Sequence, residues 1–149
     1  MSFGNKTYKG SFKPKNPAKY NGNPNNIIYR SSWEVRVMKY FDDHPDVIWW
    51  SSEELVIPYY NPVDQKMHRY FPDFYLKVKE QNGTIKKYVI EVKPLKQTVE
   101  PQPPKRRTKK YLYEAMEYAK NQAKWKAARE FCEDRRYEFK IITEKELGI

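Results

Sequence analysis

The sequence predicts an α/β fold in which a mixed sheet is flanked by helices, with the elements in the order αβββαβ. Three observations lead to this prediction. A capped, amphipathic segment at 31–43 indicates a first helix, two apolar runs around an Asn-Gly turn indicate a β-hairpin, and an alanine-rich segment that starts at 108 indicates a long second helix. The return from that helix to an apolar run at 137–142 adds a last strand to the same sheet.

The composition limits the classes of protein to which the chain can belong. With 149 residues, of which 39% are hydrophobic and 32% charged, the chain suits one globular domain. It has no apolar run near the roughly 20 residues that cross a membrane, and its N-terminus lacks the apolar stretch of a signal peptide. The lone Cys132 excludes an internal disulfide and a cysteine-rich zinc site. We therefore expect a cytoplasmic protein with no membrane partner.

The charge distribution indicates an anionic partner. Lysine and arginine number 29 against 19 acidic residues, which gives a net charge of +10, and no acidic residue precedes Glu34. A second basic cluster contains Lys105, Arg106, Arg107, Lys109 and Lys110. Nucleic acid is the first candidate partner for two such clusters. The alternative is ordinary solubilising charge.

Residues 1–26 predict a basic, extended arm ahead of a core at 27–149. The segment is rich in Asn, Gly, Pro and Lys, and it shows neither a helical nor a strand period. Its aromatic residues predict that part of the arm docks on the domain; they are Phe3, Tyr8, Phe12 and Tyr20. Aromatic rings among lysines also suit contact with nucleic acid, through stacking and phosphate pairing. The alternative is a tail without a docked structure.

The first helix is predicted to start at Ser31 and to run to about Asp43. Ser31 and Glu34 match a capping box, in which each side chain accepts a backbone N–H from the other residue. Glu34 therefore has a purely structural explanation. The core-facing side chains are predicted to be Trp33, Val37, Met38, Tyr40 and Phe41.

Strands are predicted at 47–50 and 55–60, either as two strands or as one bent strand. His44 and His68 lie near this region without the spacing of a zinc site. A β-hairpin follows, with arms at 69–76 and 88–93.

The loop length determines which side chains of the hairpin share a face. A three-residue loop with Gly83 in the left-handed conformation sets Asp73 opposite Glu91, whereas a two-residue loop would set Asp73 opposite Val92. The three-residue register aligns the apolar side chains on one face, and a slip by one residue would scatter them. We therefore predict this register, with Asp73, Glu91 and Lys93 together on the other face.

The last third of the chain predicts a loop, a helix, a strand and a short helix. The proline-rich loop begins at Pro94, and Thr108 caps a helix that runs to about Arg136. A strand at 137–142 follows, and Thr143 caps the short helix. The buried stripe of the long helix is predicted to contain Leu112, Ala115, Ala119, Ala123, Ala127 and Phe131, with Met116 and Trp125 nearby.

Asp73, Glu91 and Lys93 together suggest a metal site. Two carboxylates side by side repel each other, and one lysine does not cancel both charges. A divalent cation would do so, and carboxylate oxygens with open positions for water suit Mg²⁺ or Mn²⁺. Lys93 can then orient or deprotonate a water molecule, which is the chemistry of phosphodiester hydrolysis. The alternative is a solvated strand face on which Glu91 and Lys93 form a surface pair.

This Pro-Asp…Glu-x-Lys arrangement on two arms of a hairpin resembles the PD-(D/E)XK nuclease superfamily, whose restriction-endonuclease-like core has the predicted element order. The resemblance implies that Asp73 and Glu91 bind the metal, with the Val92 carbonyl as an extra ligand, and that Lys93 assists the nucleophile. It also implies that Glu34 in the first helix points at the same metal cluster.

A nuclease of this kind needs a surface for the phosphate backbone. The basic cluster after the proline-rich loop is predicted to lie at a helix N-terminus, which itself favours phosphate. The residues expected to contact DNA are Lys96, Lys105, Arg106, Arg107, Lys109 and Lys110.

Over nearly its whole length, the chain resembles the head completion nucleases of T-even-like tailed phages. The segments that carry the resemblance are 1–6, 23–34, 69–74 and 143–147. A more distant similarity is to TnsA-type transposon-end endonucleases, which often have Gln where this chain has Glu91. The phage family implies a Mg²⁺-dependent DNA endonuclease that acts in head completion before tail attachment. It also implies portal or neck proteins as partners, and action in the host cytoplasm or as part of the virion.

Two alternatives remain open at this point. One is a structural head-completion protein that binds DNA or the portal without cutting. The other is a transposition or repair nuclease of the same fold.

Overall fold

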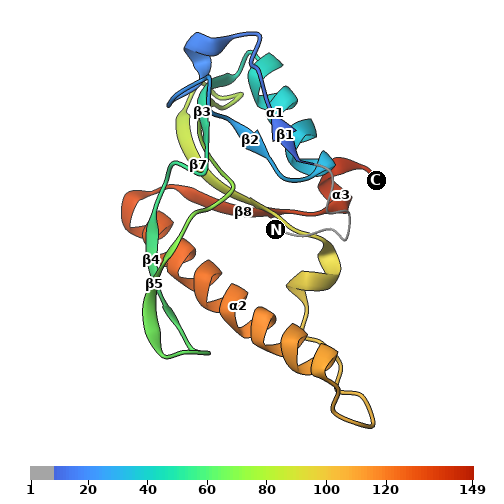
Figure 1. Ribbon diagram of the computed structural model, residues 1–149. Coiled ribbons are helices and arrows are strands. Elements are labelled where there is room, and N and C mark those ends of the chain that lie inside the picture. Colours follow the sequence, from blue (N-terminus) through green and yellow to red (C-terminus); the bar gives the residue numbers. More distant parts are fainter. Residues whose placement is uncertain (1–8) are drawn as a thin grey trace.

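The computed structural model describes residues 9–149, and its centre is a four-stranded sheet (Figure 1). In order across the sheet, the strands are β3 (Val47–Ser52), β6 (Phe74–Lys79), β7 (Ile85–Val92) and β8 (Glu138–Ile142). β6 is antiparallel to both β3 and β7, and β8 is parallel to β7. A parallel pair needs a crossover, and the long helix supplies it. The predicted mixed sheet and element order are confirmed.

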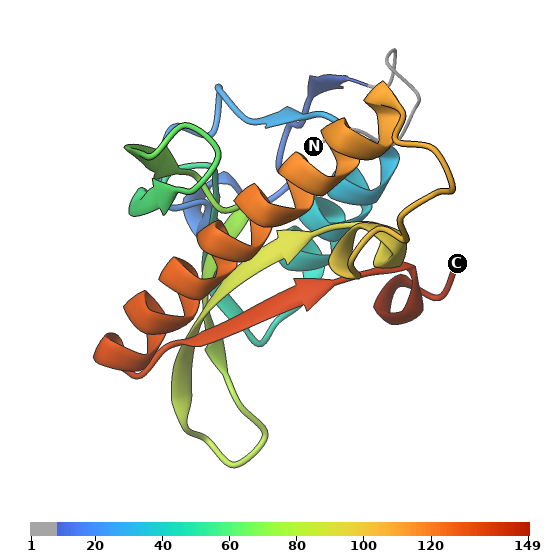
Figure 2. The same cartoon turned by 90° about the horizontal axis from the view of Figure 1, so that it is seen from below.

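Helices cover both faces of this sheet (Figure 2). α1 (Ser32–Asp43) packs on one face, against a core that contains Phe74, Leu76, Ile90 and Val92. α2 (Lys109–Arg135) packs on the other, where Trp125, Ala128 and Cys132 meet Val89. Strand side chains alternate between the faces, so the face that carries Glu91 also carries the buried Val89. This face was predicted to be the charged one, and it is more apolar than expected because α2 covers it.

The hairpin between β6 and β7 has the predicted register. Phe74 pairs with Ile90 and Leu76 with Tyr88. The same register, extended by one residue, places Asp73 beside Glu91. The Glu80 N–H donates to the Thr84 carbonyl at 2.7 Å and the Gly83 N–H donates to the Glu80 carbonyl at 2.9 Å, so the loop consists of the three residues between Glu80 and Thr84. Gly83 adopts the left-handed conformation, with a φ of +84°.

The first arm of the hairpin is shorter than the predicted 69–76. Arg69 and Tyr70 belong instead to β5 (Lys66–Tyr70), which pairs with β4 (Ile57–Asn61) in a separate two-stranded sheet. Pro72 separates the two strands, because proline cannot donate to the ladder of a central strand. The predicted strands at 47–50 and 55–60 are likewise separate. Between them Glu53 has a φ of +55°, which turns the chain out of the main sheet.

The described part of the basic arm is docked on the core. It contains β1 (Gly10–Ser11) and η1 (Pro17–Lys19), and β1 pairs with β2 (Ile28–Tyr29) at the start of the core. Phe12 and Tyr20 are buried against Trp50, with ring centroids 5.8 and 4.8 Å away, which confirms two of the predicted aromatic anchors. The other two, Phe3 and Tyr8, lie outside the described residues.

A buried carboxylate attaches this arm to α1. Asp42 accepts the backbone N–H groups of Lys15, at 2.8 Å, and of Asn16, at 3.2 Å. The Lys19 ammonium donates to the carbonyls of Asp42 and His44 at the C-terminal end of α1, where cations are favoured. The position of the arm therefore depends on the end of the helix.

The long helix buries only the C-terminal part of the predicted stripe, where Ala123, Ala127 and Phe131 pack partly buried against the core. Its buried residues are Asn121, Trp125, Ala128 and Cys132, whereas Leu112 and Met116 are exposed. The reason is that only the second half of α2 packs on the sheet and on the β4–β5 hairpin. The cap at Thr108 is confirmed, since its side chain accepts the Tyr111 N–H at 3.0 Å.

The chain ends with α3 (Glu144–Leu147), which starts with a capping box between Thr143 and Glu146. The Leu95 N–H donates to Glu144 Oε1 at 2.7 Å and so connects α3 to η2 (Leu95–Thr98), the short 3-10 helix that follows β7. Within residues 9–149, no helix has both the length and the apolar character needed to cross a membrane.

Replacing Gly83 tests the loop that sets the register. A Cβ at this position would meet nothing within 4 Å, so the left-handed backbone alone would make a substitution unfavourable. We expect Gly83→Ala to lower the free energy of unfolding by about 1 kcal/mol in urea denaturation. Gly83→Asn should lose less, because asparagine tolerates this conformation. Equal stability of Gly83→Ala and wild type would contradict the strain argument.

Candidate active site

The hairpin brings Asp73, Glu91 and Lys93 together at one end of the sheet. Asp73 precedes β6, Glu91 is the penultimate residue of β7, and Lys93 follows that strand. All three are buried, with exposed fractions of 8%, 5% and 9%. Such burial excludes the alternative of a solvated strand face, because a surface Glu-Lys pair would be exposed.

Each carboxylate is fixed by hydrogen bonds through one oxygen. Asp73 Oδ2 accepts the Val92 N–H at 2.8 Å. Glu91 Oε1 accepts the Tyr70 hydroxyl at 2.8 Å and the Asp73 N–H at 3.3 Å. Lys93 Nζ lies 3.9 Å from the other oxygen, Glu91 Oε2. The site is therefore rigid on one side, and it leaves one oxygen of each carboxylate for a ligand.

Burial and neighbouring charges disfavour the ionised forms of Asp73 and Glu91. Burial, and then the charges of Glu91 and Glu34, raise the pKa of Asp73 well above its usual value, against the Val92 N–H and Lys93, which lower it. Burial also raises the pKa of Glu91, although Lys93 and the Tyr70 hydroxyl oppose this shift. Negative charge at this site is thus only partly compensated by the protein.

Asp73 and Glu91 suit a divalent cation such as Mg²⁺. Hard cations prefer carboxylate oxygens, and one oxygen of each residue accepts no hydrogen bond from the described chain. Among residues 9–149, however, no three acidic, histidine or cysteine side chains gather closely enough to hold a metal by themselves. The pair would therefore supply part of the coordination, with the rest from the backbone, water or substrate.

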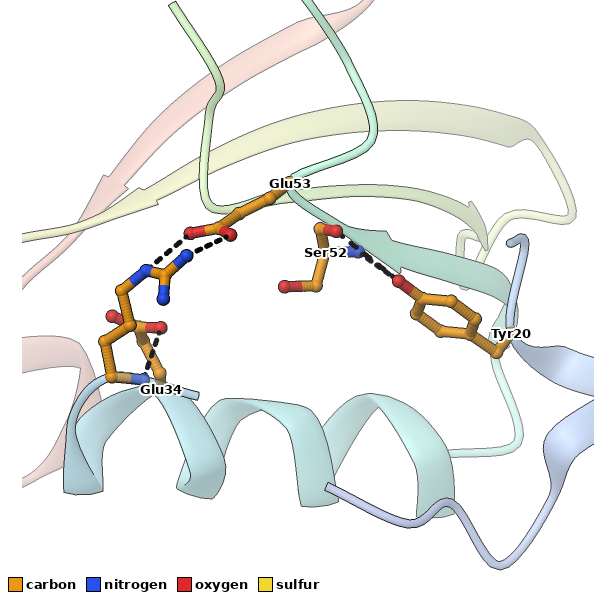
Figure 3. Close-up of polar contacts among 5 residues, drawn as sticks. Tyr20, Glu34, Ser52 and Glu53 are labelled. Atoms are coloured by element: carbon orange, nitrogen blue, oxygen red, sulfur yellow. Dashed lines mark hydrogen bonds and ion pairs between the residues drawn. The ribbon is translucent and has the colours of Figure 1, made fainter. Parts of the chain in front are cut away.

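Glu34 lies near the pair but makes a structural contact of its own (Figure 3). Its N–H donates to Ser31 Oγ at 3.1 Å, as the predicted capping box requires. Its own side chain, however, accepts the N–H of Arg30 at 3.2 Å, whereas the capping box would have it accept the N–H of Ser31. The Arg30 guanidinium pairs with Glu53 at 3.0 Å. Burial, and to a smaller extent Glu53, raises the pKa of Glu34. Glu34 thus adds negative charge close to Asp73 without joining Asp73 and Glu91 in one metal-binding group.

A cleft of about 530 Å³ begins at Lys93 and runs between the chain after β7 and the first half of α2. The predicted DNA contacts Lys96 and Lys110 line it together with Lys93. Tyr113 and Tyr118 add aromatic rings to its wall, and Glu114, Glu117 and Asn121 complete the side that α2 contributes.

The remaining basic residues lie outside the lining of this cleft. Lys105, Arg106 and Arg107 are exposed in the loop before α2, and Lys109 is exposed in its first turn. The structure therefore brings Lys96 and Lys110 to the site and leaves the rest of the cluster on the nearby surface.

Two residues beside the carboxylates were missed in the sequence. Tyr70 was assigned to the hairpin arm, and only the break at Pro72 lets its hydroxyl reach Glu91. Lys124 on α2 lies over the Tyr70 ring, 5.6 Å from its centroid. A signal for Lys124 was present, since it directly precedes the buried Trp125 on α2, but Trp125 was predicted to lie beside the buried stripe and not in it.

Comparisons with known proteins identify the family. A family model described as TnsA-like endonuclease N terminal matches residues 44–144, a range that includes Asp73, Glu91 and Lys93 but not Glu34. The chain is 39% identical over 141 residues to the head completion nuclease of Enterobacteria phage T4, which covers 92% of this chain and 91% of that protein. No solved structure matches the chain.

These matches confirm both resemblances seen in the sequence, and together with the sheet order and the buried Asp-Glu-Lys site they assign the chain. It belongs to the family of phage head completion nucleases, with a TnsA-like endonuclease domain of the restriction-endonuclease-like fold.

Proposed function

We propose that this nuclease is a Mg²⁺-dependent DNA endonuclease, for which Mn²⁺ can replace Mg²⁺. One observation supports this most strongly: two buried carboxylates stand side by side with incomplete charge compensation, next to a buried lysine, at the start of a cleft that Lys96 and Lys110 also line. Such an arrangement costs stability unless it serves a ligand.

Each residue has a distinct role in this proposal. Asp73 and Glu91 would hold the metal, with the Val92 carbonyl as a further ligand and Glu34 as an additional acidic group of the cluster. A bound divalent cation supplies Lewis acid chemistry toward the phosphodiester. Lys93 orients the attacking water, because its ammonium lies 3.9 Å from Glu91 Oε2.

DNA is held by the basic residues around the cleft. Lys96 and Lys110 line the cleft beside Lys93, and Lys105, Arg106, Arg107 and Lys109 extend the positive surface toward the N-terminus of α2. Each phosphate contact releases counterions, so binding should weaken as salt increases.

The biological role follows from the relative. The protein of phage T4 is named a head completion nuclease, and we infer that this chain also acts on DNA in head completion, before tail attachment. Portal or neck proteins of the phage head are then its expected partners, in the host cytoplasm during assembly or in the virion.

Nicking of supercoiled plasmid DNA is the direct test. The purified protein is incubated with Mg²⁺, with Mn²⁺, and with a chelator. We expect nicking with either metal and none with the chelator. Absence of nicking under every metal and DNA structure tried would favour a structural head-completion protein that does not cut DNA.

Removal of Lys93 separates metal binding from catalysis. Lys93→Ala keeps Asp73 and Glu91 and removes a positive charge that repels Mg²⁺, so Mg²⁺ affinity in calorimetric titration should equal or exceed that of wild type. The nicking rate should fall at least about a hundredfold, as for loss of a group positioned for proton transfer. The control is Lys79→Ala, at the exposed far end of β6, which should cut normally. If Lys93→Ala cuts DNA at the wild-type rate, Lys93 takes no part in cleavage.

Two variants separate the capping and functional roles of Glu34. Glu34→Gln keeps an acceptor for the Arg30 N–H but removes the charge, so stability should hold while cleavage falls about tenfold or more, as for residues that support metal ligands. Ser31→Ala removes the cap, so it should cost about 1 kcal/mol of stability with normal specific activity. If Glu34→Gln cuts like wild type, Glu34 is only a structural residue. Urea denaturation and plasmid nicking give both readouts.

The raised pKa of Asp73 predicts a pH-dependent loss of stability without metal. Its carboxyl has a higher pKa in the folded state than the usual 3.8, so the folded protein binds its proton more tightly. From about pH 4 upward, wild type should therefore lose stability relative to Asp73→Asn, until the folded-state pKa is passed. Urea denaturation at pH 4 to 8 in chelator measures this difference. Addition of Mg²⁺ at pH 8 should stabilise wild type but not the variant, and a pH-independent difference would contradict the prediction.

A further inference from the structure

Lys124 lies beside the carboxylate pair, on the helix that covers this face of the sheet. Its side chain is half-buried in α2, with Nζ 5.6 Å from the ring centroid of Tyr70 and 5.9 Å from that of Tyr59. Tyr70 in turn donates its hydroxyl to Glu91 Oε1 at 2.8 Å. One tyrosine therefore contacts the ammonium with its ring and the carboxylate with its hydroxyl, which fixes Lys124 relative to the site.

The charges of the site act directly on Lys124. Burial lowers the pKa of its ammonium, Lys120 and Lys93 lower it further, and Glu91 opposes them. Lys124 also lowers the pKa of Glu91. Lys93 Nζ lies 3.9 Å from Glu91 Oε2 at the end of β7, and Lys124 reaches from α2 to the ring of the tyrosine that donates to Glu91 Oε1, so the two lysines are placed around Glu91 by different elements.

The N–H donors of Lys124 are not used by the described protein. Within residues 9–149 its ammonium forms no ion pair and no hydrogen bond, only the two contacts with aromatic rings. Lys120, one turn earlier, differs because it pairs with Glu117 at 2.8 Å. A half-buried ammonium with three unused donors is suited to an anionic ligand.

The location of Lys124 indicates which anion it would meet. Asn121, one turn earlier on α2, lines the basic cleft together with Lys93. Lys124 does not line the cleft itself, but it lies one turn beyond Asn121, over the Tyr70 ring. A phosphate group bound at the end of the cleft near the carboxylate pair would therefore lie between Lys93 and Lys124.

We propose that Lys124 binds the phosphate of the DNA strand that is cut, as a second basic residue of the active site. Lys93 lies near Glu91 and is placed to act on water, so the negative charge of the phosphodiester needs a separate cation. Lys124 supplies it from α2, one turn beyond the cleft residue Asn121. This inference rests on the proposed DNA cleavage, and it adds a substrate contact to that function.

A purely structural role would look different. Lys124 would then act only as a counter-charge for Glu91 above the two tyrosine rings. Its removal would change stability or Mg²⁺ affinity, but it would not remove a DNA phosphate contact. The salt dependence of DNA binding separates these two roles, because it counts phosphate contacts.

The test compares Lys124→Gln and Lys124→Arg with Lys126→Gln. Lys126 is exposed on the same helix, two residues away and so on another face. Binding of a labelled DNA duplex is measured in chelator by fluorescence anisotropy, over a range of salt concentrations. Single-turnover nicking is measured with Mg²⁺ at saturating protein, and thermal melting reports folding.

We expect Lys124→Gln to reduce the log–log salt slope by about 0.9, the contribution of one phosphate contact. Its nicking rate should fall about tenfold or more, as for loss of a hydrogen bond to a charged group. Its melting temperature should not fall, because a desolvated charge is removed. Lys124→Arg should recover part of both losses, and Lys126→Gln should match wild type.

Two results would overturn the proposal. One is a salt slope and nicking rate for Lys124→Gln equal to those of Lys126→Gln. The other is a lower melting temperature with an unchanged salt slope, which would assign Lys124 a structural role. If wild type cuts no DNA at all, the proposed function fails, whereas the binding measurement still decides whether Lys124 contacts phosphate.

Discussion

The repulsion between Asp73 and Glu91 is the constraint on which the arrangement of the site depends. The register of the β6–β7 hairpin places the two carboxylates side by side, and α2 buries the face on which they lie. Hydrogen bonds from the Val92 N–H and the Tyr70 hydroxyl hold one oxygen of each. These contacts do not neutralise the pair, because burial still raises the pKa of both residues.

Elements around the hairpin supply the groups that act on this charge. Lys93 follows β7 directly, and Tyr70 arrives from the small β4–β5 sheet because Pro72 separates β5 from β6. Lys124 comes from α2, where a long side chain can cross to the Tyr70 ring. The β4–β5 hairpin thus contributes to the site, since Tyr70 contacts Lys124 of the long helix with its ring and Glu91 with its hydroxyl.

The N-terminal arm and α1 form the opposite layer of the molecule. Phe12 and Tyr20 pack on Trp50, and Asp42 binds the backbone of the arm. The Ser52 N–H donates to the Tyr20 hydroxyl at 3.1 Å, on the same strand end that leads to Glu53 (Figure 3). Arg30 then joins Glu53 to the start of α1, so the position of Glu34 depends on both the arm and β3. Docking of the arm therefore supports the acidic site as well as the core.

Local chemistry made much of this protein predictable from its sequence. The caps at Ser31, Thr108 and Thr143 are each completed within a few residues, and Gly83 determines the loop and so the pairing of Asp73 with Glu91. Tertiary packing alone decided the remaining features: which part of α2 is covered, the separate β4–β5 sheet, and the approach of Tyr70 and Lys124 to Glu91. Those contacts join elements far apart in the chain, and their geometry depends on how sheet and helices fit together, which no short stretch of sequence encodes.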